Sequence, residues 1–264
     1  MRNPPYPKLK AASGRWLGMG NSTTPETTTP PVPERSERRL ATTLAHTMAM
    51  IHRRGWCDGT GGNFSVVIQR DPLRLLMAPS GVDKGAVKPE QLIQVDGSGT
   101  VVGGTGKASA ETMLHLRIVA ACGAGAVLHT HSQSATLLSR WLAPATPDSH
   151  ASLELEGYEM LKGFEGISTH ATKVRVPVLA NDQNIVRLAE RAEPTLGTAP
   201  HGLLVAGHGL YAWGRDLETA RRHLEIHEFL LEQHWRQRLL EGLFGRGGGV
   251  QPQGPGGAPN SGSG

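Results

Sequence analysis

The sequence predicts an α/β sandwich built on a mixed, largely antiparallel central sheet. Segments with helical spacing and short β-like apolar runs are interspersed through the middle of the chain. Several strand-like runs are neighbours in sequence, and strict alternation of strand and helix is absent. Because neighbouring strands joined by short turns pair antiparallel, whereas parallel strands need long crossovers, a doubly wound parallel sheet is less favoured.

Composition divides the 264-residue chain into one folded region and two ends. Residues 1–34 and 244–264 are dominated by Pro, Thr, Ser and Gly, whereas residues 35–243 have an ordinary globular composition. Ends of this kind bury too little apolar surface to offset the entropy of ordering, so we expect both to be disordered. Residues 35–243 are expected to form a single domain.

The first predicted element is a helix from Ser36 to Gly55, with apolar residues at three- and four-residue intervals between Leu40 and Ile51. Ser36 is a suitable N-cap, and Gly55 a suitable stop. A Gly-rich turn over residues 58–63 follows. After it, the pattern predicts strands over residues 64–69 and 73–78, a helix from a Ser109 cap to about residue 121 ended by Gly123, and a buried strand over residues 126–131.

The second half of the chain is predicted to add further strands and a long terminal helix. Residues 141–152 are expected to form a loop. The remaining predicted elements are a short helix around 157–164, a strand over 174–179, a helix over 181–191, a strand pair over 202–206 and 210–213, and a helix from 216 to about 243. The last helix has its apolar positions at helical spacing, which indicates one buried face.

Charge and composition exclude several classes of partner. The chain has 27 Lys and Arg against 23 Asp and Glu, but five of the basic and only two of the acidic residues lie in the two ends. The folded region is therefore nearly neutral, which argues against nucleic acid. No apolar run approaches the ~20 residues that span a bilayer, so no membrane partner is expected. Two cysteines outside any CxxC pair suit a reducing, cytoplasmic location.

The strongest signal for chemistry is His129-Thr130-His131, at the end of the buried strand. Side chains two residues apart on a strand lie on one face, so both imidazoles project together. A third imidazole, His208, stands between two glycines, which allow close approach of the backbone. Neutral imidazole suits zinc, and a catalytic zinc keeps three protein ligands and one open position. The three histidines together predict one catalytic zinc ion per subunit, although an isolated His-x-His is more often two ordinary histidines.

A second histidine pair, His223 and His227, has i, i+4 spacing on the last predicted helix. The zinc-protease motif with this spacing requires Glu directly after the first histidine, and Leu224 stands there. We therefore expect this pair to lie on a surface or interface face of the helix.

Three small-residue segments have the composition of anion-binding turns. They contain Asn63, Ser80 with Gly81, and Ser109, and Lys84 would add positive charge. Turns rich in Ser and Gly expose backbone N–H groups, and a helix N-terminus favours phosphate. None matches a dinucleotide-binding or P-loop motif. Each segment alone is better explained by an ordinary turn or cap, and Lys84 by a solvated side chain.

Taken together, these segments resemble the class II aldolase/adducin family over about residues 36–240. The resemblance is carried, in order, by Gly62-Asn63-Phe64-Ser65, Pro79-Ser80-Gly81, Ser109-Ala110-Glu111-Thr112, His129-Thr130-His131-Ser132 and Gly207-His208-Gly209-Leu210-Tyr211. It implies a three-layer α/β/α sandwich, a metal-dependent lyase acting on a small sugar phosphate, and a homotetramer with active sites at subunit contacts. By the family's pattern, the metal ligands are His129, His131 and His208, and the phosphate contacts are Asn63, Ser80, Gly81 and Ser109.

Within the family, the chain most resembles a branch of dehydratases. This resemblance is carried by residues 159–164, 176–178, 181–183 and 207–214. It implies that Glu159 moves protons during loss of water. Glu111 matches the acid/base of the aldolases, and its role here is open between approaching the metal and contacting the substrate. A sugar-phosphate aldolase or epimerase is the alternative, and a non-catalytic adducin-like module is disfavoured because all three histidines are retained.

Overall fold

The computed structural model describes residues 32–245, which form a nine-stranded sheet in the order β4-β3-β2-β1-β5-β9-β8-β7-β6. Its strands are β1 (Asn63–Arg70), β2 (Leu73–Met77), β3 (Ile93–Asp96), β4 (Val101–Gly103), β5 (Ala126–Thr130), β6 (Ala151–Glu156), β7 (Lys173–Leu179), β8 (Gly202–Val205) and β9 (Gly209–Gly214). Every neighbouring pair is antiparallel except β7 and β8. The predicted mixed, largely antiparallel sheet is confirmed.

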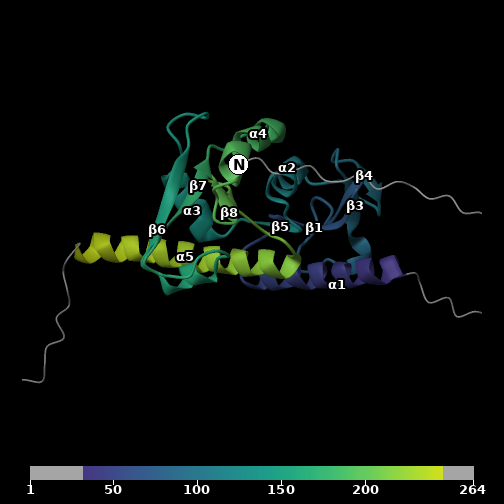
Figure 1. Ribbon diagram of the computed structural model, residues 1–264, viewed down its shortest axis with the longest axis horizontal. Coiled ribbons are helices and arrows are strands. Elements are labelled where there is room, and N and C mark those ends of the chain that lie inside the picture. The colour runs from purple at the N-terminus through teal and green to yellow at the C-terminus, as the bar shows by residue number, and fades with distance from the viewer. Residues whose placement is uncertain (1–31, 246–264) are drawn as a thin grey trace, which may run out of the picture.

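Helices cover both faces of this sheet (Figure 1). One face carries α1 (Val32–Arg53), α3 (Gln133–Trp141) and α5 (Leu217–Phe244), and the other carries α2 (Thr112–Cys122) and α4 (Ile185–Leu196). Two short 3-10 helices, η1 (Pro89–Gln91) and η2 (Glu159–Gly163), lie in the connections. The three-layer α/β/α architecture is confirmed.

The central strand β5 shows why the sheet is covered on both sides. Ala126 and Leu128 belong to the apolar core under α1, α3 and α5, whereas Val127 belongs to the core under α2 and α4. All five residues of the strand are buried. Each fully buried side chain of the size of Leu stabilises the fold by roughly 1.5–3 kcal/mol. A strand that is buried on both faces has consecutive apolar residues in its sequence, as residues 126–128 show.

Several helix boundaries differ from the predictions for local reasons. α1 begins at Val32 rather than Ser36, because proline is tolerated in the first turn of a helix. α2 begins at Thr112 rather than after a Ser109 cap, since the Thr112 N–H and hydroxyl both donate to the Ser109 carbonyl in a preceding turn. α4 begins at Ile185 because the Asn184 side chain accepts from the Arg187 N–H.

Five elements were not predicted: β3, β4, α3, β6 and the short 3-10 helix η1. β6 begins inside the segment 141–152 that was expected to be a loop. The two ends expected to be disordered lie outside the described residues, apart from 32–34, which belong to α1, and 244–245. Among the helices that the structure describes, none is both long and apolar enough to cross a bilayer.

Candidate metal centre

Side chains from three adjacent strands meet at the end of β5. In the register of the sheet, His129 on β5 lies opposite Asn63 on β1 and opposite Tyr211 on β9. Residues directly opposite one another on neighbouring strands project from the same face. The pairing therefore brings together three side chains that are far apart in sequence.

The other two predicted ligands join His129 from the ends of strands. His131 lies one residue beyond β5, where its N–H donates to the Trp56 carbonyl at 2.8 Å. His208 lies in the turn between β8 and β9, where its N–H donates to the Val205 carbonyl at 3.0 Å. The Nε2 atom of His129 lies 2.8 Å from that of His131 and 3.3 Å from that of His208. The structure thus brings the three predicted histidines together.

Two glycines permit this approach. A Cβ atom on Gly209 would lie 2.0 Å from the Thr130 carbonyl oxygen, and one on Gly62 would lie 2.6 Å from the His129 carbonyl oxygen. Gly62 also has a φ of +71°, in the left-handed region that favours glycine. Any larger residue at either position would push β5 away from its neighbours.

Glu111, the N-cap residue of α2, closes the cluster. Its Oε1 lies 2.9 Å from His208 Nε2, its Oε2 lies 3.5 Å from His129 Nε2, and Asn63 Nδ2 donates to Oε2. Burial by itself would raise the pKa of Glu111, but the hydrogen bond with His208 and the neighbouring imidazoles outweigh it and lower the pKa. Glu111 is therefore ionised at neutral pH.

These residues fit a divalent metal ion. One ligand atom from each of Glu111, His129, His131 and His208 lies within 4.8 Å of the others. His129 Nδ1 donates to the Leu210 carbonyl at 2.9 Å, which leaves the lone pair of Nε2 facing the cluster. Burial lowers the pKa of both His129 and His131, so both are in the neutral form that binds metal.

Two further residues at the cluster were not predicted. The Tyr211 ring stacks on His129, with centroids 3.9 Å apart and planes 14° apart. Burial, reinforced by the charge of Glu111, raises the pKa of Tyr211 well above its usual value, so its hydroxyl stays protonated. His115 on α2 lies 2.8 Å from the Ser65 hydroxyl, and burial lowers its pKa to about 4. Tyr211 belongs to the Gly207–Tyr211 segment that carries the family resemblance. Its contact with His129 was not predicted because the contact depends on the register between β5 and β9.

Backbone contacts join the turns that contain Ser80 and Ser109. The Ser80 N–H donates to the Lys107 carbonyl at 2.8 Å, and Ser109 Oγ accepts from the Glu111 N–H at 3.3 Å. Gly81, with a φ of +76°, completes the first turn. These two predicted phosphate-contact segments therefore lie side by side and lead directly to the carboxylate of the cluster.

Lys84 is not a solvated loop residue. It is 2% exposed, and its Nζ donates to the carbonyls of Thr60 and Val82 at 3.0 and 2.9 Å. Burial lowers its pKa, against the opposing charges of Cys57, Asp83 and Glu111. Its own charge contributes to the lowered pKa of His131. Lys84 thus supplies buried positive charge close to the histidines.

The predicted acid/base Glu159 does not join the cluster within one chain. It lies on η2, its side chain is 71% exposed, and its carboxylate contacts Lys162 Nζ at 2.5 Å and His170 Nδ1 at 3.5 Å. The hydrogen bond from Lys162 lowers its pKa. A single chain therefore contains the four-residue cluster but keeps Glu159 at its surface.

The expectation that His223 and His227 face a surface is wrong. Both are fully buried on α5, where His223 Nδ1 donates to the Trp213 carbonyl at 2.8 Å and His227 Nε2 donates to the Pro200 carbonyl at 3.0 Å. The helix packs this face against β8 and β9, where each of the two backbone carbonyls accepts one imidazole N–H.

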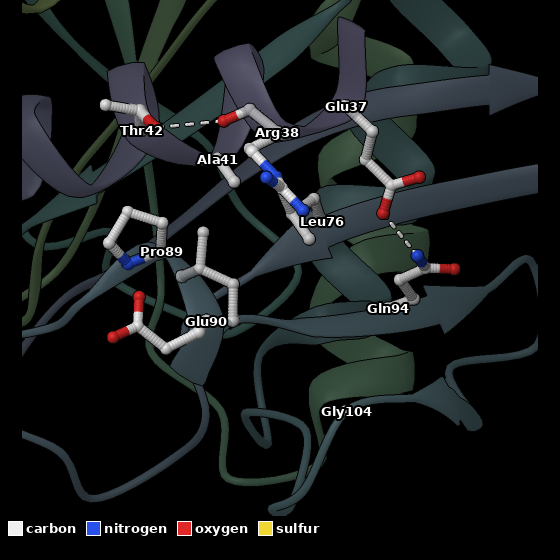
Figure 2. Close-up of a pocket in the computed structure, with 10 residues that line it drawn as sticks. Glu37, Arg38, Ala41, Thr42, Leu76, Pro89, Glu90, Gln94 and Gly104 are labelled. Atoms are coloured by element: carbon white, nitrogen blue, oxygen red, sulfur yellow. Dashed lines mark hydrogen bonds between the residues drawn. The ribbon is translucent and has the colours of Figure 1, made fainter. Parts of the chain in front are cut away.

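Cavity size does not identify the site. A cavity of about 840 Å³ lies between α1 and the strands β2 and β3, where Gln94 donates to Glu37 (Figure 2). None of its lining residues is a predicted site residue. The candidate site is identified by the convergence of its donor atoms.

Comparison with known proteins agrees with this geometry. Residues 42–235 match the profile of the class II aldolase and adducin N-terminal domain. The chain is 42% identical over 209 residues to a methylthioribulose-1-phosphate dehydratase of Pectobacterium atrosepticum, covering 78% of this chain and 98% of that protein. It is 42% identical over 218 residues to a protein of the same name from Xanthomonas campestris pv. campestris, covering 81% and 96%.

Solved structures share the fold. An L-fuculose 1-phosphate aldolase aligns with a TM-score of 0.62 at 23% identity, covering 76% of this chain and 87% of that one. An L-fuculose-1-phosphate aldolase from Thermus thermophilus aligns with a TM-score of 0.58 at 24% identity, covering 78% and 98%. At this level of identity, these structures support the architecture alone.

Proposed function

The chain belongs to the class II aldolase and adducin family, and from this membership and its site we propose that it is a metal-dependent dehydratase of methionine salvage. Its substrate is 5-methylthioribulose 1-phosphate, and its product is 2,3-diketo-5-methylthiopentyl 1-phosphate. Relatives named methylthioribulose-1-phosphate dehydratase match the chain at about 42% identity over nearly their whole length. The observation that carries the proposal is the convergence of His129, His131 and His208 on one point beside Glu111.

Zinc, one ion per subunit, is the metal we assign to this site, with the three histidines as its ligands. A zinc ion bound there supplies Lewis-acid polarisation of the substrate's carbonyl. Glu111 orients the imidazole of His208 and the amide of Asn63 through its two carboxylate oxygens. The carbonyl of Leu210 keeps His129 in the tautomer with a free Nε2 lone pair.

Proton transfer is assigned to Glu159. The substrate has a ketone at C2, so the C3 proton is acidic, and loss of water removes this proton together with the C4 hydroxyl. Glu159 takes the proton from C3, the electron pair of that bond forms a C3–C4 double bond, and the proton returns to the departing C4 hydroxyl as water leaves. The product of this step is the enol at C3, which becomes the 2,3-diketone when its hydroxyl proton is lost and C4 gains a proton. The exposed Glu159 carboxylate is ionised at neutral pH, which is the form that accepts a proton, although the hydrogen bond from Lys162 lowers its pKa.

Because Glu159 is exposed and apart from the cluster in its own chain, we assign it to the site of a neighbouring copy. The assembly is a homotetramer with active sites at subunit contacts. The exposure of the Glu159 side chain, at 71%, supports this arrangement. The site is then complete only in the oligomer, which we place in the cytoplasm.

Phosphate binding is assigned to the turns beside Glu111 and to Lys84. Asn63, Ser80 and Ser109 offer polar side chains, Gly81 offers a backbone N–H in its turn, and Lys84 offers a buried positive charge. Holding the 1-phosphate there fixes the reacting carbons relative to the histidines.

Incubation of the zinc-loaded protein with 5-methylthioribulose 1-phosphate tests the proposed reaction. We expect formation of the diketone with no dihydroxyacetone phosphate, and no cleavage of L-fuculose 1-phosphate as a control substrate. Release of dihydroxyacetone phosphate would mean that the chain is an aldolase. Absence of both turnover and bound metal would support a non-catalytic adducin-like module.

A further inference from the structure

A second group of metal-ligating side chains lies outside the cluster described above. Glu165 follows η2, His201 directly precedes β8, and His223 lies on α5. One ligand atom from each lies within 4.8 Å of the others, the same limit that the four-residue cluster meets. We propose that Glu165, His201 and His223 bind a second divalent metal ion, of the kind that imidazole and carboxylate ligands prefer, such as Zn²⁺.

His223 is oriented as a metal ligand. Its Nδ1 donates to the Trp213 carbonyl at 2.8 Å, which leaves the lone pair on Nε2. The Glu165 N–H lies 3.5 Å from this Nε2, a long contact that a metal ion can replace. His129 is held in the same way by the Leu210 carbonyl. Since both carbonyls belong to β9, this strand sets the tautomer of one histidine in each group.

His201 is placed beside His223 by an uncommon backbone conformation. Its φ of +57° lies in the left-handed region, which few residues other than glycine adopt. Hydrogen bonds from its N–H to the Ala199 carbonyl and from the Trp213 N–H to its carbonyl hold it there, at 2.8 and 3.0 Å. The two rings stack with centroids 4.1 Å apart and planes 18° apart. Because the two ring planes are nearly parallel, binding of one ion by both imidazoles requires the half-buried His201 ring to tilt.

Both imidazoles of this second group are neutral near pH 7. Burial lowers the pKa of His223 to about 4 and also lowers the pKa of His201. Neutral imidazole is the form that binds metal, so no proton has to leave before an ion enters.

Glu165 completes the donor set and remains available to an ion. Arg215 and Arg222 both approach its carboxylate through the same oxygen, Oε1. Their side chains are 68% and 52% exposed, and ion pairs of exposed arginines are weak. A divalent ion that binds the carboxylate therefore displaces at most a weak contact.

Two of the three proposed ligands adjoin a cavity. A cavity of about 600 Å³ adjoins the group and is lined by Glu165 and His201, together with Phe164 and Pro200. An ion bound there would connect the segment after η2, the start of β8 and the middle of α5. Such a bridge between segments far apart in sequence stabilises the fold.

Zinc titration of the chelator-treated, full-length protein against a chromogenic zinc indicator tests the site. We expect two equivalents per chain for the unmodified protein and one for His201→Asn. Asparagine is chosen because it tolerates the left-handed backbone at this position. His131→Asn should keep the equivalent bound by the second group. His46→Asn changes an exposed histidine of α1 and should keep both equivalents.

Glu165→Gln is a second variant that keeps the shape of the side chain and should weaken the second equivalent by at least about tenfold. Circular dichroism shows whether each variant is folded. Equal numbers of zinc equivalents in the unmodified protein and in His201→Asn would overturn the proposal, whichever site those equivalents occupy. The experiment measures bound metal rather than turnover. A negative result for the second site can therefore be told apart from failure of the proposed reaction.

Discussion

Two carboxylates of the proposed active site have opposite surroundings. Glu111 is enclosed among imidazoles and the amide of Asn63, whereas Glu159 is exposed beside Lys162. A carboxylate that contacts two ligands acts mainly by orienting them, while one that is free to approach a substrate is suited to move a proton. The difference in surroundings separates the two roles.

Glu159→Gln should therefore lower kcat by about 10²–10⁴-fold, because the neutral amide cannot take a proton. Bound metal should stay at one equivalent in the active site. Steady-state kinetics and metal analysis on the same preparation measure both quantities. Glu156→Gln, an exposed change on β6 nearby in sequence, is the matched control and should leave kcat unchanged. A near-normal kcat in Glu159→Gln would transfer the role to Glu111.

We expect Glu228 to make the stability of the fold depend on pH. This fully buried residue of α5 accepts a hydrogen bond from the Thr130 hydroxyl, between two metal ligands, at 2.6 Å. Burial raises its pKa to about 7, against the opposing effect of hydrogen bonds from Ser132 and Thr130. Between its unfolded value of 4.5 and about 7, the folded state holds a proton that the unfolded state has released. The free energy of unfolding therefore falls as pH rises through this range.

We expect this fall to reach about 3 kcal/mol between pH 5 and pH 8. The side chain in Glu228→Gln cannot titrate. The free energy of unfolding of this variant, relative to that of the unmodified protein, should therefore increase as pH rises. Urea denaturation of both proteins at pH 5, 6, 7 and 8 measures the difference. Parallel stability curves over the whole range would show that Glu228 does not titrate in this way.

Strand pairing assembles the site at the level of elements. The sequence patterns predict β1, β5 and β9 individually and give His129 and His131 a common face. They do not specify which residues lie opposite one another, because register depends on contacts between distant strands. The row formed by Asn63, His129 and Tyr211 is therefore a property of the assembled sheet. For the same reason, the stacking of Tyr211 on His129 was not predicted.

Four of the unpredicted elements divide into three kinds. β6 alternates exposed and buried positions, with Leu153 and Leu155 in the core, so a period of two was present in the sequence. β3 and β4 are only four and three residues long, too short for a periodic signal. α3 follows the histidines directly, and its N-cap, Ser132, was counted with the metal motif. Local patterns therefore fail where elements are very short or overlap a functional motif.

Gly209→Ala tests the close approach of β9 to β5. The added Cβ would lie 2.0 Å from the backbone oxygen of Thr130, so the strands must move apart beside His208. We expect a loss of stability of about 1–3 kcal/mol, together with weaker metal binding. Thermal unfolding and zinc affinity measure the two effects.

Gly242→Ala is the control for this change. Gly242 lies in α5, and a Cβ there meets no atom within 4 Å. Alanine should raise stability by up to about 1 kcal/mol through its helix propensity, without an effect on metal. Equal unfolding temperatures for the two variants would contradict the packing argument.

At the scale of the whole molecule, the proposed site needs two chains. In the proposed assembly one chain supplies the histidine cluster and another supplies Glu159, so we expect variants damaged in different halves to complement each other. Co-expression of His131→Asn with Glu159→Gln should restore about a quarter of the unmodified activity, because random pairing leaves some sites intact. The control is a mixture of the two separately purified homo-oligomers, assayed before subunits exchange. Activity that stays at background in the co-expressed sample would place Glu159 in its own chain's site.

The most direct test of the central claim is a zinc titration of the metal-free protein with dehydration of 5-methylthioribulose 1-phosphate followed in the same samples. Turnover should rise in proportion to occupancy of the His129, His131 and His208 site and reach its plateau when that site is full. The His131→Asn variant should remain inactive at every zinc concentration. Full turnover by metal-free protein, or by metal-loaded His131→Asn, would contradict the assignment of these three histidines as the catalytic metal centre.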